Sequence, residues 1–520
     1  MPRYTKKVGS DLPLASLQIR RSVLIFVVFC TILIAAYGAR HRTPWNDEGW
    51  FSSPAYNLAF NGYMGTTVLE PTFFKLTRIE QKTYWVMPLF LAGQGLWYKV
   101  FPHTLLGTRA FSLFWALVAL LGFGALMEGL FPGTAMSRLA CILLASSFIF
   151  MDNAGFARPD MMCAALGICG LGAYVSLRER SLPLAMLAAN ACIAASGLSH
   201  PNGVFHLLAL GVLVLWLDHS RIRLPELAAA AIPYLLFAGL WSIYILQDKQ
   251  AFIDQMTMNG ANGSNSRWTP TWNPFLILKN EIEGRYVQAF GLATRGLSLI
   301  KLFALGAYIS AIVLCVSSAK LRQMSSVQLL LVLLAVYFIA MSIFNQKLTY
   351  YLIHILPMYV ALLAVAICWL WERWPRYRKL LVAGVVGLIM LETGGIVAKA
   401  ATRSYIAKQQ EMLLFVRSQS RPGDLIVGTA ALVYEMDFDP RLSDDPYLGV
   451  RSGRVPDVII LDSLLYAPLY AGWEIERPAD MKLIHQRLSE YRKVRQIGDY
   501  EIYLRPERMV LKDKAEAQAK

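Results

Sequence analysis

Two adjacent carboxylates, Asp47 and Glu48, follow directly after the first long apolar run of the chain. That run covers residues 22–39 and is long enough to cross a bilayer as a helix. The pair lies between Trp45 and Trp50, and tryptophans are enriched at the depth of lipid headgroups. Acidic side chains in this place are positioned for chemistry on a lipid-borne group.

Further polar residues are expected at the same ends of the following helices, and carboxylates alternate with cations among them. Polar groups at membrane depth are costly unless they are paired or line a wet cavity. A cavity of this composition suits the binding of a phosphate together with the removal of a proton. The residues are Glu80, Lys82, Tyr84, Arg158, Asp160, His200, Lys347 and Tyr350.

Each of these residues also has a structural interpretation. Asp47 and Glu48 could cap an interfacial helix, and Asp160 could cap the helix that follows it. The two lysines, Lys82 and Lys347, could extend to lipid headgroups. A histidine before a proline, as at His200, is typical of a turn.

The elements that must position these residues are membrane-spanning helices. The chain has 520 residues, 56% of them hydrophobic, and a mean hydropathy of +0.43. Its net charge of +15 lies mostly at helix ends, which excludes a nucleic-acid-binding interpretation. Eleven spans are expected: 22–39, 109–130, 138–156, 161–177, 183–199, 203–218, 224–246, 297–318, 325–344, 350–371 and 380–398.

The segment 84–101 decides the orientation of everything after it. Its apolar core of about thirteen residues contains Pro88 and Gln94, which favours a re-entrant or interfacial helix. With this segment outside, the short external turns hold only Arg158 and Lys347. The short cytoplasmic loops then hold eleven basic residues, as the positive-inside rule requires: Arg138, Arg178, Arg180, Arg221, Arg223, Lys320, Arg322, Arg373, Arg376, Arg378 and Lys379.

The predicted organisation is therefore an all-α polytopic membrane domain over residues 1–400, with long external loops at 40–108 and 247–296. Residues 401–511 read as a small α/β extracytoplasmic domain, because short β-rich runs alternate with helical stretches there. Residues 512–520 are expected to be a disordered tail. The seven cysteines fall inside apolar runs and are expected to act as small buried hydrophobes: Cys30, Cys141, Cys163, Cys169, Cys192, Cys315 and Cys368.

At the polar residues the chain resembles the GT-C superfamily of integral-membrane glycosyltransferases. The resemblance covers roughly residues 20–360 and extends most closely to protein O-mannosyltransferases and lipid A aminoarabinose transferases. It rests on four short motifs: Asp47-Glu48 opening the first external loop, Glu80-x-Lys82-x-Tyr84-Trp85, Asp160 ending the third span, and Lys347 followed by Tyr350.

The resemblance implies a polyprenyl-phosphate sugar donor, with Asp47 as general base toward the acceptor. Glu48 and Asp160 would shape the acceptor or sugar site, and Lys82 and Lys347 would face the donor phosphate. Arg158 and His200 would belong to the same cavity, as would Tyr84 and Tyr350. A divalent cation stays open, with Glu80 as its candidate ligand.

The chain departs from this family in two places. Gly49 and Trp50 follow the acidic pair where the aminoarabinose transferases carry Leu-Arg, and the part after about residue 400 gives no match. The acceptor therefore stays open between a lipid, a protein and a polysaccharide. Because a lipid phosphate is already a good leaving group, one base and a nearby cation suffice, and we expect displacement with inversion. The rival interpretation is a non-enzymatic transporter or flippase of a lipid-linked sugar.

Overall fold

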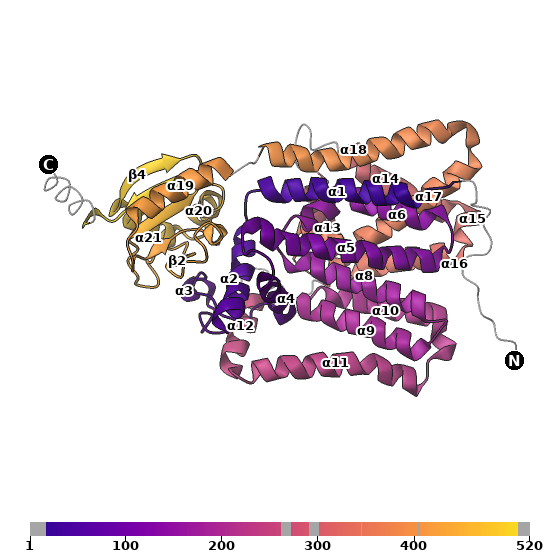
Figure 1. The fold of residues 1–520 in the computed structure, drawn as a ribbon, viewed down its shortest axis with the longest axis horizontal. Coiled ribbons are helices and arrows are strands. Elements are labelled where there is room, and N and C mark those ends of the chain that lie inside the picture. Colours follow the sequence, from indigo (N-terminus) through magenta and orange to yellow (C-terminus); the bar gives the residue numbers. More distant parts are fainter. Residues whose placement is uncertain (1–16, 262–271, 291–300, 345, 403–405, 508–520) are drawn as a thin grey trace.

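The protein consists of a bundle of long, roughly parallel helices with a small sheet-containing domain at one end (Figure 1). The computed structural model describes residues 17–261, 272–290, 301–344, 346–402 and 406–507. The expected tail 512–520 lies outside the described residues, as do the first four residues of the expected span 297–318.

Nine helices of the described part are long and apolar enough to cross a membrane. A bent pair, α6 (Ala135–Ser146) and α7 (Phe148–Ala154), makes a tenth crossing if it is counted as one span, and the shorter apolar helix α14 covers Lys301–Ser317. In chain order these helices overlap the eleven expected spans, but in the described part nine, or ten with the bent pair, are long enough to cross a membrane. The nine are α1 (Arg21–His41), α5 (Leu105–Leu130), α8 (Pro159–Leu177), α9 (Leu182–Ser199), α10 (Gly203–Asp218), α11 (Leu224–Ile245), α16 (Ser325–Ile343), α17 (Leu356–Arg373) and α18 (Arg378–Thr402).

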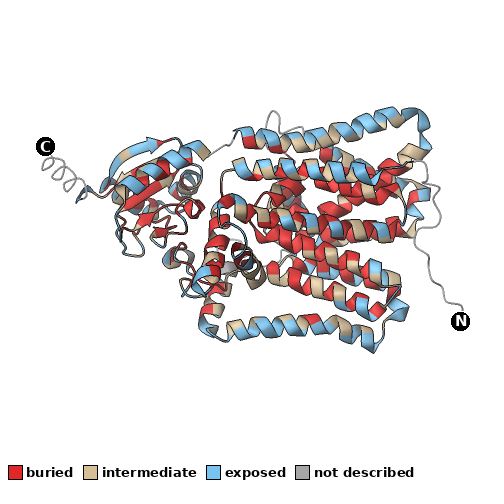
Figure 2. Ribbon diagram, in the orientation of Figure 1, coloured by how far each residue is buried: buried red, intermediate tan, exposed pale blue. Residues whose placement is uncertain are grey.

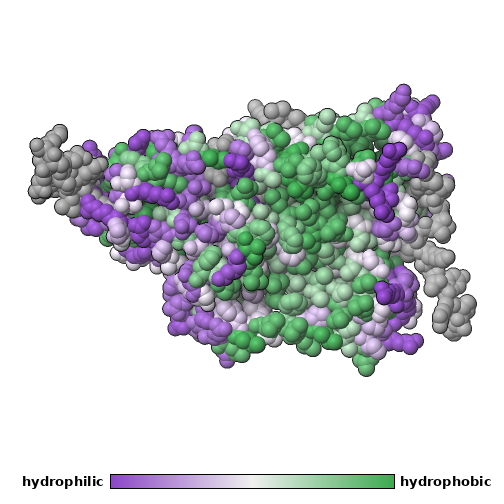
Figure 3. Space-filling view, in the orientation of Figure 1, coloured by the Kyte–Doolittle hydropathy of each residue, from purple (hydrophilic) through white to green (hydrophobic). Residues whose placement is uncertain are grey.

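The surface of the bundle agrees with a multi-pass membrane protein. A hydrophobic band crosses it, with hydrophilic residues gathered at both ends (Figure 3). Helices α11 and α18 are exposed along most of their length, whereas the centre of the bundle is buried (Figure 2). In water such apolar exposed helices would be unfavourable, so their surroundings are expected to be lipid.

The break between α6 and α7 has a specific cause. The two helices are bent by 61° at Ser147, whose backbone is extended. The first free amide of α7, at Phe148, donates to the Glu392 carboxylate of α18 at 2.5 Å. A buried helix start needs such an acceptor, and a distant carboxylate provides it here.

The segment 84–101 contains the helix α4 (Pro88–Tyr98), which is only 11 residues long and too short for a span. It packs on α2 (Asn46–Asn61). Its polar residue Gln94 is fully buried and donates to Ser52 of α2 and to Tyr98 at 3.1 Å each. The prediction of a short helix here is confirmed.

Several short helices gather at the end of the bundle that carries the sheet domain. They are α2, α3 (Pro71–Phe74), α4 and α12 (Lys249–Ala261) (Figure 1). The second long loop also contains α13 (Pro274–Glu281) and the π-helix η2 (Ile282–Val287). Before α17, the chain forms the 3-10 helix η4 (Thr349–His354).

The C-terminal part is a mixed five-stranded sheet of order β2-β1-β3-β5-β4. Strand β1 pairs in parallel with β2 and β3, while β5 runs antiparallel to β3 and β4. The small α/β fold expected after residue 401 is confirmed, although the sequence analysis missed β2 and α20. The elements are α19 (Ile406–Gln419), β1 (Ile426–Val427), β2 (Leu442–Ser443), β3 (Val458–Asp462), α20 (Tyr466–Glu476), α21 (Pro478–Ser489), β4 (Arg492–Ile497) and β5 (Tyr500–Leu504).

This sheet domain packs closely on α2, and Gly49 makes that contact possible. A Cβ at position 49 would lie 2.1 Å from the carbonyl oxygen of Ala430, so a larger residue would push the two parts apart. Next to it, the Trp50 indole donates to Asp444 of the sheet domain at 2.8 Å. The Gly49-Trp50 departure from the aminoarabinose transferases thus has a structural reason.

Candidate functional site

Asp47 lies in the first turn of α2 and lines a cavity. Helix α2 begins at Asn46 after an extended Trp45, and carboxylates in a first turn are stabilised by the helix dipole. The cavity has a volume of about 540 Å³. Of the residues predicted for the site, Asp47, Arg158, His200 and Tyr350 line it.

Seven segments that are separate in the sequence line this cavity, so it forms only when the chain is folded. They are the start of α2, the stretch before α4 with the first residues of α4, the start of α8, the α9–α10 turn, α12, the π-helix η2 and the segment that leads into α17. Its polar lining residues are Asp47, Arg158, Ser199, His200, Asn202, Arg285, Gln346, Tyr350 and Tyr351.

Arg158 joins two of the predicted carboxylates. Its Nη1 forms an ion pair with Asp47, and its Nε donates to Asp160 Oδ2 at 2.9 Å. The guanidinium lies 4.1 Å from the centroid of the Tyr350 ring, a cation–π contact. The Asp160 side chain is 1% exposed and that of Asp47 is 18% exposed. Asp47 is therefore the carboxylate that a molecule in the cavity can reach.

Asp160 has one oxygen directed toward His200. Its Oδ1 is buried, has no hydrogen-bond partner among the described residues, and lies 4.0 Å from His200 Nε2. His200 Nδ1 accepts from the Asn202 amide at 3.1 Å, which assigns the imidazole proton to Nε2. The N–H of His200 therefore faces the Asp160 carboxylate across a gap that a small movement or a bound group would close.

Glu48 has a different environment from its neighbour. It is fully buried, does not line the cavity, and accepts from Arg109 Nε at 2.8 Å and from Arg109 Nη2 at 2.6 Å. It also accepts from the amides of Trp45 at 3.1 Å and Ala157 at 2.9 Å. The structure thus places Glu48 behind the cavity wall and not in the acceptor or sugar site expected of it.

Arg109 is the partner that the sequence analysis missed. It is fully buried on α5 and also donates to the carbonyl oxygen of Arg42 at 2.9 Å. The ion pair with Glu48 therefore fixes the start of α2 against α5 and the end of α1. A lone arginine inside an apolar span was the available signal, because such a residue needs a buried partner.

Glu80, Lys82 and Tyr84 are not brought to the Asp47 cavity. Glu80 and Lys82 line a separate cavity of about 750 Å³, where Lys82 Nζ donates to Gln247. Tyr84 is buried and donates to the carbonyl oxygen of Tyr244 at 3.0 Å. The expectation that Lys82 shares one pocket with Asp47 is not met. Residues 85–87, which follow Lys82 and Tyr84 in the chain, line the Asp47 cavity instead.

Lys347 lies beside the Asp47 cavity within a buried cluster of charges. Its Nζ is 2.9 Å from Glu281 Oε2, and burial is the largest influence on its pKa, which is lowered although Glu281 acts in the opposite direction. The adjacent residues Gln346 and Leu348 line the cavity. Lys347 therefore does not line the cavity itself. It shares its partner Glu281 with Arg285, which does line the cavity.

Arg285 is the second cation of this cluster, and it lines the cavity directly. Its Nη1 donates to Glu281 at 2.7 Å and its Nη2 donates to the Gln346 carbonyl at 3.1 Å. Its Nε is buried without a hydrogen-bond partner among the described residues. Sequence reasoning missed both Arg285 and Glu281, although their spacing of four residues in a long loop was a signal of a helical ion pair.

The named charges of the site balance one another. Three cations (Arg158, Arg285 and Lys347) lie among three carboxylates (Asp47, Asp160 and Glu281). Arg285 lines the cavity with a side chain that is only 2% exposed, so it acts on an anion in the cavity through its positive charge, while its Nε is buried away from the open space. The arrangement can bind an anion at Arg285 and offer a reachable carboxylate at Asp47.

Metal ligation was left open by the sequence analysis, with Glu80 as the candidate. Within the described ranges, the group of three residues with metal-ligand spacing is Cys163, His206 and His354, which does not include Glu80. None of these three lines the Asp47 cavity.

The fold is similar to those of two solved membrane enzymes. ArnT from Cupriavidus metallidurans bound to undecaprenyl phosphate superimposes with a TM-score of 0.60 at 13% identity, covering 93% of this chain and 98% of that one. The Archaeoglobus fulgidus oligosaccharyltransferase tethered with an acceptor peptide gives a TM-score of 0.53 at 12% identity, covering 91% and 72%. AglB from the same organism, in complex with an inhibitory peptide and a dolichol-phosphate, gives 0.51 at 12% identity, covering 93% and 74%.

By sequence, no protein-family model and no curated protein matches the chain. At these identities the likeness concerns the fold. Both neighbours belong to the GT-C superfamily, so the fold predicted from the sequence resemblance is confirmed.

Proposed function

We propose that the protein is a glycosyltransferase that moves a sugar from a polyprenyl-phosphate donor to an acceptor at the extracytoplasmic surface of a membrane. One observation carries the proposal: a partly exposed carboxylate, Asp47, and a cation, Arg285, line the same cavity. The fold supports it, because structures of this shape hold undecaprenyl phosphate, dolichol-phosphate and peptides.

In this proposal Asp47 is the general base. It takes the proton from an acceptor hydroxyl or amine while the acceptor atom forms a bond to the anomeric carbon of the sugar. The bond from that carbon to the phosphate oxygen breaks, and its electron pair leaves with the lipid phosphate. Arg158 pairs with both Asp47 and Asp160, so it orients the Asp47 carboxylate at the cavity.

The departing phosphate gains negative charge, and a preorganised cation stabilises it. Arg285 takes this role in place of Lys82, because Arg285 lines the Asp47 cavity and Lys82 does not. Lys347 supports it by sharing Glu281, which leaves Arg285 less strongly neutralised. The product should have the inverted anomeric configuration, and NMR of the product tests this directly.

The orientation follows from the charge bias of the sequence. We propose that the N-terminus is cytoplasmic and that the cavity and the sheet domain lie outside. The hydrophobic tail of the donor would then lie among the helices while its phosphate reaches Arg285. The sheet domain holds the start of α2 and so keeps Asp47 in place.

The test uses a deletion strain complemented with variants, followed by mass spectrometry of surface glycolipids and glycoproteins. Deletion should remove one sugar mass, which also identifies the sugar and the acceptor. Wild type should restore it and Asp47→Asn should not. Asp248→Asn is the matched control, since this carboxylate is paired with Arg78 at 2.7 Å outside the cavity.

Binding of undecaprenyl phosphate to the purified chain, followed by native mass spectrometry, separates an enzyme from a transporter. We expect Asp47→Asn to retain lipid-phosphate binding while it loses transfer. Restoration of the missing sugar by Asp47→Asn would overturn the assignment of Asp47 as the base.

A further inference from the structure

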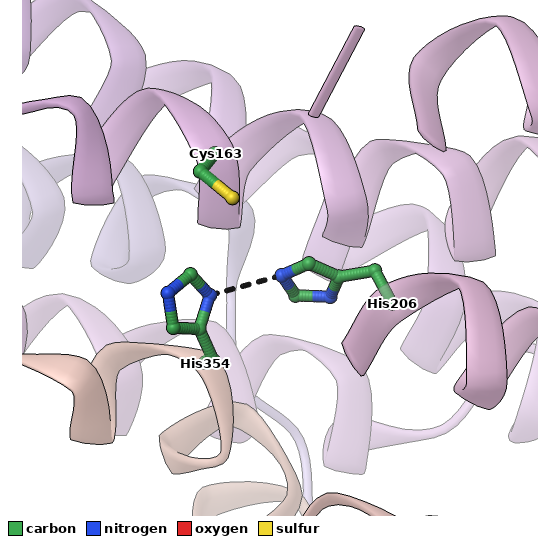
Figure 4. Close-up of side chains that lie close together, drawn as sticks. All are labelled: Cys163, His206 and His354. Atoms are coloured by element: carbon green, nitrogen blue, oxygen red, sulfur yellow. Dashed lines mark hydrogen bonds between the residues drawn. The ribbon is translucent and has the colours of Figure 1, made fainter. Parts of the chain in front are cut away.

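A cysteine and two histidines from three distant segments meet in the interior of the helix bundle. Cys163 lies on α8, His206 on α10 and His354 at the end of η4 (Figure 4). All three are buried, and one ligand atom from each lies within 4.8 Å of the others. The set is outside the proposed glycosyltransferase site, which uses none of these residues.

The two imidazoles face each other at a distance close to that of ligands on one metal ion. His206 Nε2 and His354 Nδ1 are 3.1 Å apart. Zinc binds imidazole nitrogen at about 2.0–2.1 Å, so two such nitrogens in a tetrahedral site are about 3.4 Å apart. The two imidazole nitrogens would therefore have to move apart only slightly, and turn toward a common point, to bind one ion. The Cys163 thiol lies near both rings (Figure 4).

The outer nitrogens of both rings already have partners. His206 Nδ1 lies 2.6 Å from the Tyr337 hydroxyl, and His354 Nε2 lies 3.3 Å from Asn202 Nδ2. Metal-bound histidines generally use their second nitrogen in such a hydrogen bond, which fixes the orientation of the ring. Both histidines are thus held with one nitrogen directed at the other histidine and one anchored.

Gly167 makes room for this arrangement. A Cβ at position 167 would lie 2.1 Å from Cγ and Cδ2 of the His206 ring. Any other residue here would displace the imidazole, so the glycine of α8 and the histidine of α10 fit each other. Gly167 follows Cys163 by one turn of α8. The close packing of α8 and α10 at Gly167 therefore places the His206 ring near Cys163.

We propose that Cys163, His206 and His354 form a binding site for a borderline-soft divalent metal ion of the zinc class. One thiolate with two imidazoles is a ligand set that suits zinc, whereas magnesium and calcium require oxygen ligands. Binding releases the thiol proton of Cys163. The Nδ1 proton of His354 moves to Nε2, and the Asn202 amide turns so that its oxygen accepts it.

The turn between α9 and α10 contacts both this site and the Asp47 cavity. The Cys163 thiol lies 3.7 Å from the His200 carbonyl oxygen, and His200 and Asn202 line the Asp47 cavity. Once bound, the ion would join α8, α10 and η4 directly behind that cavity. We therefore expect metal binding to stabilise the fold of this region, as any ligand of the native state does.

The test is X-ray absorption spectroscopy of the full chain, purified without chelators through a tag that contains no histidine and then loaded with zinc. The expected result is one zinc per chain, with one sulfur at about 2.3 Å and two nitrogens at about 2.0–2.1 Å. A shell of oxygen and nitrogen alone, or no retained zinc after gel filtration, would overturn the proposal. This measurement needs no variant and does not depend on transferase activity.

Cobalt(II) substitution gives an independent readout on variants. The thiolate-to-cobalt absorption band should appear in wild type, disappear in Cys163→Ser, and persist in Cys169→Ser. Cys169 is the matched control because it lies on the same helix, and its thiol contacts the Val118 carbonyl at 3.3 Å. A band that persists in a folded Cys163→Ser protein would refute the assignment.

Discussion

Two carboxylate–guanidinium pairs begin at neighbouring residues of α2 and have opposite character. Glu48 and Arg109 are fully buried, and the two oxygens of Glu48 together accept four hydrogen bonds. Asp47 is 18% exposed, lines a cavity, and is paired with Arg158, which a second carboxylate also contacts. The buried Glu48–Arg109 pair holds helices together. In the proposed function, the Asp47–Arg158 pair at the cavity takes part in the reaction.

Helix geometry produces this difference. Successive residues of an α-helix are turned by about 100° from each other, so two adjacent carboxylates cannot face the same surroundings. Glu48 faces α5, and Asp47 faces the cavity. Under the proposed function, activity belongs to the pair that lines the cavity, and the fully buried pair fixes its position. The following predictions test this division from the largest effect to the smallest.

Replacement of Asp47 by Asn should have the largest effect on activity. Without the base, we expect transfer to fall roughly 10²–10⁴-fold. The temperature of unfolding should change little, because the Asp47 side chain is partly exposed and Asp160 remains as a counter-charge for Arg158. Transfer is measured by product formation in proteoliposomes, and unfolding by intrinsic fluorescence. A large loss of stability in Asp47→Asn would break the comparison with Glu48.

Replacement of Glu48 by Gln should have its main effect on stability. It leaves the guanidinium of Arg109 buried without a counter-charge, and breaking such a pair costs about 3–5 kcal/mol. We expect a clear fall in the unfolding temperature in detergent. The matched control is Glu411→Gln, which removes a surface pair with Arg495 and should cost at most about 1 kcal/mol. Equal effects of the two substitutions would contradict the assignment of Glu48 as an anchor.

Substitutions of Arg285 and Lys82 test which of the two cavities binds the donor phosphate. If Arg285 holds the lipid phosphate, Arg285→Gln should weaken undecaprenyl phosphate binding about 10–100-fold, the range expected for one charge-assisted hydrogen bond. Lys82→Gln should leave that affinity unchanged, because Lys82 lines the other cavity. Native mass spectrometry of the lipid complex measures both. A stronger effect at Lys82 would return the donor phosphate to the second cavity.

Much of the fold could be predicted from the sequence because apolar length determines membrane spans. The short helix α4 could be recognised because Pro88 and Gln94 interrupt its apolar core. The ends of the helices then brought Asp47, Arg158, His200 and Tyr350 to one cavity. Residues next to helix ends are placed by the helices themselves, so their convergence follows from topology.

The remaining features depend on side-chain direction and on contacts between distant segments. Lys82 lies in an irregular stretch, where a few residues decide which cavity a side chain enters. Arg285 belongs to a π-helix in a long loop, for which sequence patterns are weak. Cys163 and His354 lie on segments far apart in the sequence, so their meeting was visible only in the folded chain.

Asp444 of the sheet domain is a third carboxylate that contacts α2. Its hydrogen-bond donors are neutral groups, whereas Asp47 and Glu48 are each paired with an arginine. It is fully buried and accepts from the Trp50 indole at 2.8 Å, the Tyr466 hydroxyl at 2.9 Å and the Ala430 amide at 3.1 Å. Burial raises the pKa of Asp444 to about 6, and the three hydrogen bonds oppose this rise only in part. Asp444 is therefore expected to change charge near pH 6.

The sign of the effect on stability follows from proton binding. The ordinary pKa of this carboxyl is 3.8 and the folded value is about 6, so between these values the folded state binds more protons than the unfolded state. The contribution of Asp444 to the free energy of unfolding therefore falls as pH rises from about 4 to 6 and is then constant. We expect a higher unfolding temperature at pH 5 than at pH 7, and a smaller difference in Asp444→Asn. Because burial also raises the pKa values of Asp445 and Asp462 to about 6, the variant should reduce the pH dependence without abolishing it. An unchanged pH dependence in Asp444→Asn would show that the contact between the sheet domain and Trp50 does not titrate.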